Sequence, residues 1–126
     1  MLYKRDENAG GYFEPAAGVG IKSMVYGEKT HMCEFKLRKG SRLPDHSHPH
    51  EQTGLVVSGR IIINIDGKDF DAGPGDAWCI AGGVTRRAEV IDDSIVVEVF
   101  SPRREDYISR MGPGPDIPER KATPQP

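Results

Sequence analysis

Three of the four histidines in this chain lie in one short polar segment, residues 45–52 (DHSHPHEQ). Side chains two positions apart on a β-strand point to the same side, so His46 and His48 can present their imidazole rings to one point. Gln52 follows four positions later and can add an amide oxygen. Imidazole nitrogen and amide oxygen suit Mn, Fe, Ni or Zn. The segment therefore predicts either one divalent metal ion held by His46, His48 and Gln52, or an ordinary polar loop.

The other histidines and the two cysteines favour structural roles. His50 has the same parity as the two candidate ligands, but Pro49 distorts a strand and makes parity unreliable there. His31 alternates with apolar residues and is expected to be an interior histidine. Cys33 and Cys79 are far apart and fit no CxxC spacing, so both are expected to be buried thiols.

Length and charge limit the function classes. A chain of 126 residues has room for one domain with its own core. The 17 basic and 19 acidic residues nearly cancel, which gives no electrostatic footprint for nucleic acid or an anionic membrane. There is no signal-like segment and no apolar run long enough to span a bilayer. We therefore expect a soluble, cytoplasmic protein that binds neither nucleic acid nor membrane.

Period-2 alternation of apolar and polar residues is the main structural signal, and it predicts many short strands. The expected strands are residues 31–38, 55–65, 68–71, 77–80 and 95–100. Turns are expected at 58–59, 66–67 and 73–76, where glycine recurs. The only helical expectation is a short turn at 104–111. Such a series of strands favours a sandwich or a closed barrel.

The placement of glycine and proline also suggests boundaries within the chain. Residues 1–17 are expected to form an N-terminal arm and residues 18–109 the barrel. Residues 110–126 are rich in glycine and proline and have almost no apolar content, which is typical of a flexible tail.

The polar segment and its flanks resemble the first motif of the cupin family. That motif has a glycine, five residues, HxH, three or four residues, an acid or amide, six residues and a glycine. Gly40, His46, His48, Gln52 and Gly59 stand at those spacings. The resemblance implies an all-β fold, namely a double-stranded β-helix (jelly-roll) barrel. It also implies a dimer, which is common in the family.

The second cupin motif matches only in part. Residues 74–76 (PGD) and the apolar run 77–80 fit, but the position of the last family ligand, usually histidine, holds Arg86. A guanidinium stays protonated and has no lone pair for a metal. Water, His31 or His50 could complete a weaker site, the metal could be lost, or Arg86 could turn outward. Of these, we expect the metal to be retained.

Within the cupins, the segments 46–52 (HSHPHEQ) and 99–106 (VFSPRRED) are similar to the pectin-degradation proteins that linearise unsaturated uronates. The resemblance implies that Glu98 and Arg104 are catalytic, and that Phe100 and Arg86 contact the substrate. The acid is usually aspartate in that family, so Glu98 is one methylene longer.

These residue types suit such chemistry. Ring opening needs proton transfer, which a positioned carboxylate supplies, and a guanidinium binds the carboxylate of a uronate. Glu98 shares its strand face with Val96 and Phe100, so its pKa is expected to be raised. The structural alternatives are a solvent-facing or ion-paired Glu98 and a surface Arg104.

Three functional hypotheses remain open from the sequence. The first is a metal-dependent enzyme acting on a small sugar acid or similar carboxylate, in particular an unsaturated uronate. The second is a non-catalytic module that binds or senses a small ligand. The third is another cupin reaction, such as a dioxygenase or an isomerase. A homodimer is expected from the resemblance.

Overall fold

The computed structural model describes residues 2–7 and 10–110 of the chain. The expected tail, residues 110–126, lies outside the described residues except for Arg110. The described elements, in chain order, are η1 (Arg5–Glu7), β1 (Phe13–Ala16), β2 (Val19–Tyr26), β3 (His31–Leu37), β4 (Arg42–His46), β5 (Glu51–Ile65), β6 (Lys68–Ala72), β7 (Ala77–Ile80), β8 (Arg86–Ser101) and α1 (Glu105–Arg110).

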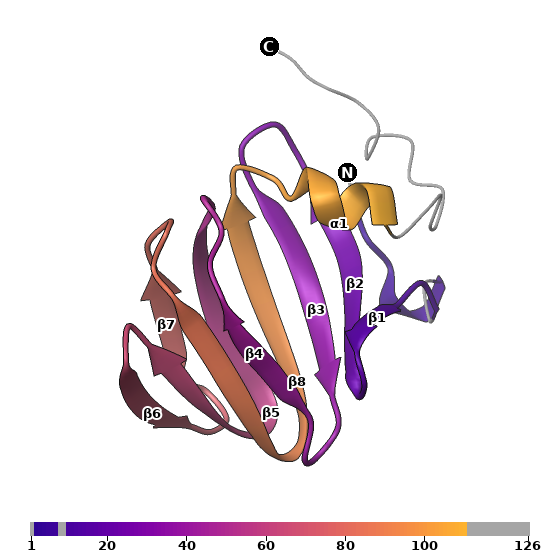
Figure 1. Ribbon diagram of the computed structural model, residues 1–126. Helices are drawn as coiled ribbons and strands as arrows, with labels where there is room; N and C mark the ends of the chain where they lie inside the picture. Colours follow the sequence, from indigo (N-terminus) through magenta and orange to yellow (C-terminus); the bar gives the residue numbers. More distant parts are fainter. Residues whose placement is uncertain (1, 8–9, 111–126) are drawn as a thin grey trace.

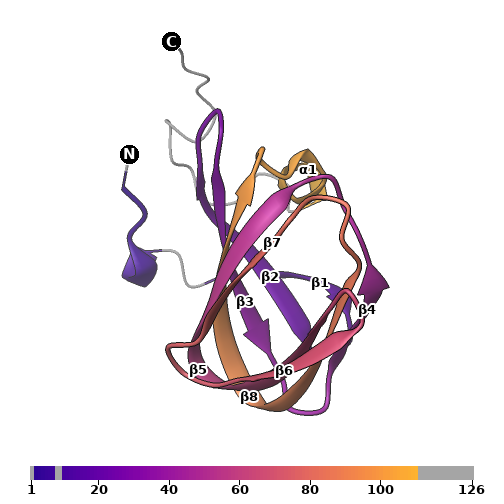
Figure 2. The same cartoon turned by 90° about the vertical axis from the view of Figure 1, so that its left-hand side faces the viewer.

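Two long, bent strands, β5 and β8, form the frame of the molecule (Figure 1). The first part of β5 and the second part of β8 lie in one layer with β7, β3, β2 and β1. Their other parts lie in a second layer with β4 and β6. All pairings are antiparallel, and the turned view shows the layers curving around a common interior (Figure 2). The expected all-β jelly-roll barrel is confirmed.

The bend between the two layers depends on Gly59. The pairing register of β5 and β8 shifts at Ser58 and Arg60. Gly59 has φ +93°, and a Cβ there would collide with Ser94 of the crossing strand. We expected a turn at residues 58–59, which is wrong: β5 runs through them as an irregular strand. The bend lets one strand serve both layers, so the chain does not reverse.

The turn at Asp66-Gly67 has the conformation predicted from the sequence. The φ angles are +52° for Asp66 and +85° for Gly67, as a type I′ hairpin turn requires. The side-chain oxygen of Asn64 accepts a hydrogen bond from the Gly67 amide at 3.0 Å. This hairpin fixes the register of β5 and β6.

Strand parity determines which side chains reach the interior. On β8, Val96, Glu98 and Phe100 are buried, which confirms that Glu98 faces inward between apolar neighbours. His31 on β3 is fully buried, with Ser23 Oγ 2.6 Å from its Nε2 and the Arg104 amide donating to its Nδ1 at 3.1 Å. It is the interior histidine that the sequence predicts.

Two expectations need revision. Cys33 is buried but Cys79 is exposed, because the alternation along β7 turns Trp78 and Ile80 inward and Cys79 outward. The segment expected as an N-terminal arm includes β1, which pairs with β2.

No helix among the described residues is long and apolar enough to cross a membrane. The one α-helix within residues 2–7 and 10–110, α1, has six residues.

Candidate active site

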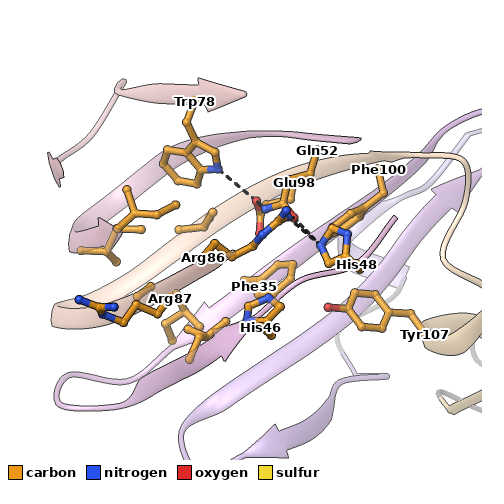
Figure 3. Close-up of a pocket in the computed structure, with 16 residues that line it drawn as sticks. Phe35, His46, His48, Gln52, Trp78, Arg86, Arg87, Glu98, Phe100 and Tyr107 are labelled. Atoms are coloured by element: carbon orange, nitrogen blue, oxygen red, sulfur yellow. Dashed lines mark hydrogen bonds between the residues drawn. The ribbon is translucent and has the colours of Figure 1, made fainter. Parts of the chain in front are cut away.

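A cavity lies inside the barrel between the two layers (Figure 3). Its walls are mostly apolar, and one group of polar and aromatic side chains lies among them. They include His46, His48, Gln52, Trp78, Arg86, Glu98 and Tyr107. His48 also borders a wider hollow at the surface, which His50, Arg104 and Asp106 line together with their neighbours.

Neighbouring strands bring these side chains together from distant parts of the sequence. Gln52 on β5 pairs with Phe100 on β8, and the next inward position on β8 is Glu98. His46 at the end of β4 pairs with Arg86 at the start of β8. His48 follows in the loop between β4 and β5. The barrel therefore places the predicted histidines, amide, acid and arginine in one region.

The guanidinium of Arg86 is the centre of the cluster. Its Nε and Nη2 donate to the Val84 carbonyl at 3.0 and 2.7 Å, and Nη2 also donates to the Ala81 carbonyl at 3.3 Å. Its Nη1 donates to Gln52 Oε1 at 2.6 Å and to His48 Nε2 at 2.9 Å. A guanidinium has five N–H donors, and these five contacts use them all. Arg86 was expected to contact the substrate directly, but it has no donor left to do so.

Hydrogen-bond partners define the protonation of the two nearby rings. His48 Nε2 lies within reach of Arg86 Nη1, which can only donate, and of Gln52 Oε1, which can only accept; the charge-assisted contact with Arg86 assigns Nε2 as an acceptor and places the proton of the neutral ring on Nδ1. His46 Nδ1 lies 2.8 Å from the Pro44 carbonyl, which only accepts, so the lone pair of His46 is on Nε2. His48 Nε2 and Gln52 Oε1 are 2.8 Å apart. Two lone pairs thus converge on one cationic nitrogen.

The residues of the predicted metal site do not fit a metal ion in this arrangement. Two of its three donor atoms, His48 Nε2 and Gln52 Oε1, already accept hydrogen bonds from Arg86. A divalent ion about 4 Å from a guanidinium would be repelled by roughly 8 kcal/mol at an effective dielectric constant of 20. The described residues contain no cluster of three His, Cys, Asp or Glu side chains that could hold a metal. The expectation of a retained metal fails this test because Arg86 points inward.

Glu98 is buried beside this cluster, and one of its carboxylate oxygens accepts two hydrogen bonds. Trp78 Nε1 donates to Glu98 Oε2 at 3.2 Å, and Gln52 Nε2 donates to the same oxygen. Burial raises the pKa of Glu98 to about 7, although both hydrogen bonds and the charge of Arg86 act to lower it. A carboxyl group with such a pKa can both donate and accept a proton near neutral pH.

The pKa of His48 is shifted in the opposite direction. Burial and the positive charges of Arg104 and Arg86 lower the pKa of His48 to about 4. The ring is therefore neutral at pH 7, as its hydrogen bond with Arg86 requires.

The raised pKa of Glu98 predicts a pH-dependent stability. The unfolded glutamate ionises near pH 4.5 and the folded one near 7. Over that interval the folded state binds more protons, so the free energy of unfolding falls as pH rises, by up to about 3 kcal/mol. Urea unfolding of the wild type and Glu98→Gln at pH 5 and pH 8 measures this. His48 acts in the opposite direction in both proteins, so their difference isolates Glu98; an identical pH response would contradict the prediction.

Arg104 lines the surface hollow that shares His48 with the cavity, here called the mouth, and is held on three sides. Its Nε and Nη2 donate to the two carboxylate oxygens of Asp106 at 3.0 and 2.8 Å. Its guanidinium carbon lies 3.8 Å from the Tyr107 ring centroid and 4.9 Å from that of Phe100. Only 6% of Arg104 is exposed, which excludes the alternative of a surface arginine.

Three buried polar atoms at this mouth have no hydrogen-bond partner among the described residues. They are Arg104 Nη1, His48 Nδ1 and His50 Nδ1. The rings of His48 and His50 are 5.2 Å apart, and both residues line the hollow with Arg104. Arg104 Nη1 and His48 Nδ1 carry protons, and buried donors without partners are costly, so this pair is suited to a ligand that accepts hydrogen bonds.

Sequence reasoning missed the roles of Trp78 and Tyr107 in the cavity. From the sequence alone, Trp78 is most simply a core or interface aromatic, and Tyr107 carries no distinguishing signal. The available signal for Trp78 was Gly54, a lone glycine within a strand, which often marks close approach of another group. Gly54 pairs with Trp78, and a Cβ at Gly54 would collide with the indole ring.

Replacing Gly54 by alanine is therefore expected to displace Trp78 from Glu98. Trp78 is the only tryptophan of the chain, so its fluorescence reports the change directly. We expect a shifted emission maximum and a loss of about 1–3 kcal/mol in the free energy of unfolding, as for other overpacked sites. Gly27→Ala is the control, because a Cβ there meets nothing within 4 Å. An emission spectrum unchanged in Gly54→Ala would contradict this.

Comparison with known proteins agrees with the fold and the motif. A family model described as "Cupin domain" matches residues 33–101, more than half of the chain. The chain belongs to the cupin family. This cupin has no match among the curated protein sequences.

Solved structures resemble the cupin over most of its length. KdgF from Halomonas sp. is 26% identical, with a TM-score of 0.78 over 84% of this chain and 96% of that one. An RmlC-like cupin from Shewanella frigidimarina is 25% identical, with a TM-score of 0.73 over 76% and 86% of the two chains. A predicted oxalate decarboxylase from Thermotoga maritima is 18% identical, with a TM-score of 0.69 over 80% and 98%, and supports the fold alone.

Proposed function

We propose that this cupin is an enzyme that opens the ring of a small unsaturated uronate. The observation that carries the proposal is Glu98, a buried carboxyl group whose pKa of about 7 suits proton transfer at neutral pH. The resemblance of its motifs to the uronate-linearising proteins supports the same substrate class, and the likeness to KdgF supports the shared barrel.

The donors at the mouth would bind the substrate carboxylate. Arg104 Nη1 and His48 Nδ1 each have a proton to donate and no partner among the described residues. A carboxylate accepts hydrogen bonds from guanidinium and imidazole N–H groups, and pairing with a buried guanidinium gives a strong, directional contact. The Phe100 ring lies 5.7 Å from that of His48 and 4.9 Å from the guanidinium carbon of Arg104, and it would contact the sugar ring.

Ring opening then requires proton transfer and cleavage of one carbon–oxygen bond, with no further reactant. A proton leaves the anomeric hydroxyl, the bond between the anomeric carbon and the ring oxygen breaks, a carbonyl forms, and the ring oxygen receives a proton. Glu98 would exchange a proton with the substrate, and the hydrogen bonds from Trp78 and Gln52 would hold its carboxyl group in place. Atoms and charge balance without a further reactant.

The test is whether purified protein accelerates loss of cyclic 4,5-unsaturated galacturonate, followed by NMR. We expect acceleration by the wild type and by Arg42→Ala, an exposed arginine on β4, and a large loss in Arg104→Ala. Absence of any acceleration by the wild type would rule out this function.

A non-catalytic ligand-binding role is the second candidate. Arg86 favours it, because a side chain bonded through all five donors leaves little room for rearrangement in the interior. Tight binding of the uronate without turnover, measured by calorimetry, would support this role instead.

We also propose that the protein acts as a homodimer in the cytoplasm. The outer face of the β3–β8–β5 layer carries a set of apolar side chains with partial exposure, namely Met32, Leu55, Val57, Val97 and Val99. Burial of such a patch would favour association. Light scattering of the purified protein measures the oligomeric state.

A further inference from the structure

We propose that the guanidinium of Arg86 is a built-in replacement for the metal ion of this barrel, and that Arg86 alone prevents the site from binding one. The proposal concerns how the site is assembled. It does not depend on which substrate the protein takes, so it stands apart from the proposed function.

The positive charge of Arg86 lies where a metal ion would lie. Arg86 Nη1 is 2.9 Å from His48 Nε2 and 2.6 Å from Gln52 Oε1, and those two acceptor atoms are 2.8 Å apart. Lone pairs brought this close repel one another unless a cation lies between them. The cationic nitrogen of Arg86 provides that charge, so the acceptors stay together without any other ion.

The guanidinium of Arg86 is also fixed in place. Val84 and Ala81 accept from the far side of the guanidinium, so the group is bound at both ends and is only 3% exposed. Glu98 is joined to the cluster through Gln52. Turning Arg86 outward would leave the Val84 carbonyl without its side-chain donor and break the charge-assisted hydrogen bonds of Arg86 to His48 and Gln52, which is unfavourable in a buried site.

The other candidate metal ligands, His46, His48 and Gln52, keep donor atoms suited to a metal. His46 donates its Nδ1 proton to the Pro44 carbonyl, the arrangement that orients a metal-binding histidine and leaves Nε2 free. His48 also presents its Nε2 lone pair, and Gln52 presents its amide oxygen. Position 86 lies opposite His46 in the β4–β8 pairing, so an imidazole there would join the other three.

The experiment is a metal titration of untagged wild type and Arg86→His with Co²⁺, whose visible absorption reports coordination. We expect Arg86→His to bind one Co²⁺ per chain at least about 100-fold more tightly than the wild type, with the gain lost in Arg86→His/His48→Ala. Arg42→His is the matched control. It makes the same change of charge at an exposed position on β4 and is expected to bind like the wild type.

A second measurement starts from the wild type, so the test does not depend on folding of Arg86→His. We expect a chelator, and saturating Mn²⁺, Ni²⁺ or Zn²⁺, to leave its melting temperature unchanged. Stoichiometric metal in purified wild type, or a saturable rise in melting temperature that His48→Ala removes, would overturn the proposal. A folded Arg86→His that takes up no metal would also overturn it. None of these readouts involves turnover, so failure here is distinguishable from failure of the proposed function.

Discussion

Turnover of unsaturated galacturonate is expected to fall at least about 100-fold when Glu98 is replaced by glutamine. The amide has the same size and its oxygen can still accept from Trp78 and Gln52, so the fold is retained. It cannot exchange a proton at neutral pH, and that is the role assigned to Glu98. Initial rates at pH 7, with circular dichroism of the same samples, measure the effect.

The matched control is Glu51→Gln. Glu51 lies on β5, next to Gln52, but its side chain is exposed on the outer face of the barrel. Its loss is expected to leave the rate within about two-fold of the wild type, because surface changes away from the site are usually near neutral. Full activity in Glu98→Gln would show that proton transfer does not pass through Glu98.

Replacing Phe100 by alanine is expected to cost about 3–5 kcal/mol in the free energy of unfolding. Phe100 is 1% exposed, and its ring contacts Tyr107 and His48 edge-on at 5.7 Å and lies beneath Arg104. Removing it leaves a cavity and deprives Arg104 of an aromatic surface. Because such a loss is a large part of the stability of a small domain, activity is expected to fall with it.

Urea unfolding of Phe70→Ala provides the comparison. Phe70 on β6 is 42% exposed, so its truncation removes far less buried surface, and a cost below about 1 kcal/mol is expected. Equal losses in the two variants would mean that Phe100 does not form part of the core at the site.

The sequence predicted the fold because its signals are local and agree with one another. Alternation placed Glu98 on the inner face with Val96 and Phe100, and the Asp66-Gly67 pair predicted a hairpin that the structure contains. Gly59 was recognised by its spacing, but its role in bending β5 was not, because that role depends on Ser94 of a distant strand.

The fate of Arg86 could not be read from the sequence in the same way. Its direction depends on the Val84 and Ala81 carbonyls, which a turn brings within reach, and on acceptors 34 and 38 positions earlier in the chain. Likewise, the partnership of Trp78 with Glu98 requires the pairing of β7 with β5 and of β5 with β8. The partners of a long side chain depend on which residues the fold brings near it, and residue spacing alone does not specify those residues.

The most direct measurement is the initial rate at which the wild type consumes cyclic unsaturated galacturonate before and after exhaustive chelation. A guanidinium-centred site with Glu98 as its acid and base predicts the same accelerated rate in both samples. Loss of the rate on chelation and its return with added metal would contradict the role given to Arg86. A rate no faster than that without protein, in both samples, would contradict the proposed reaction itself.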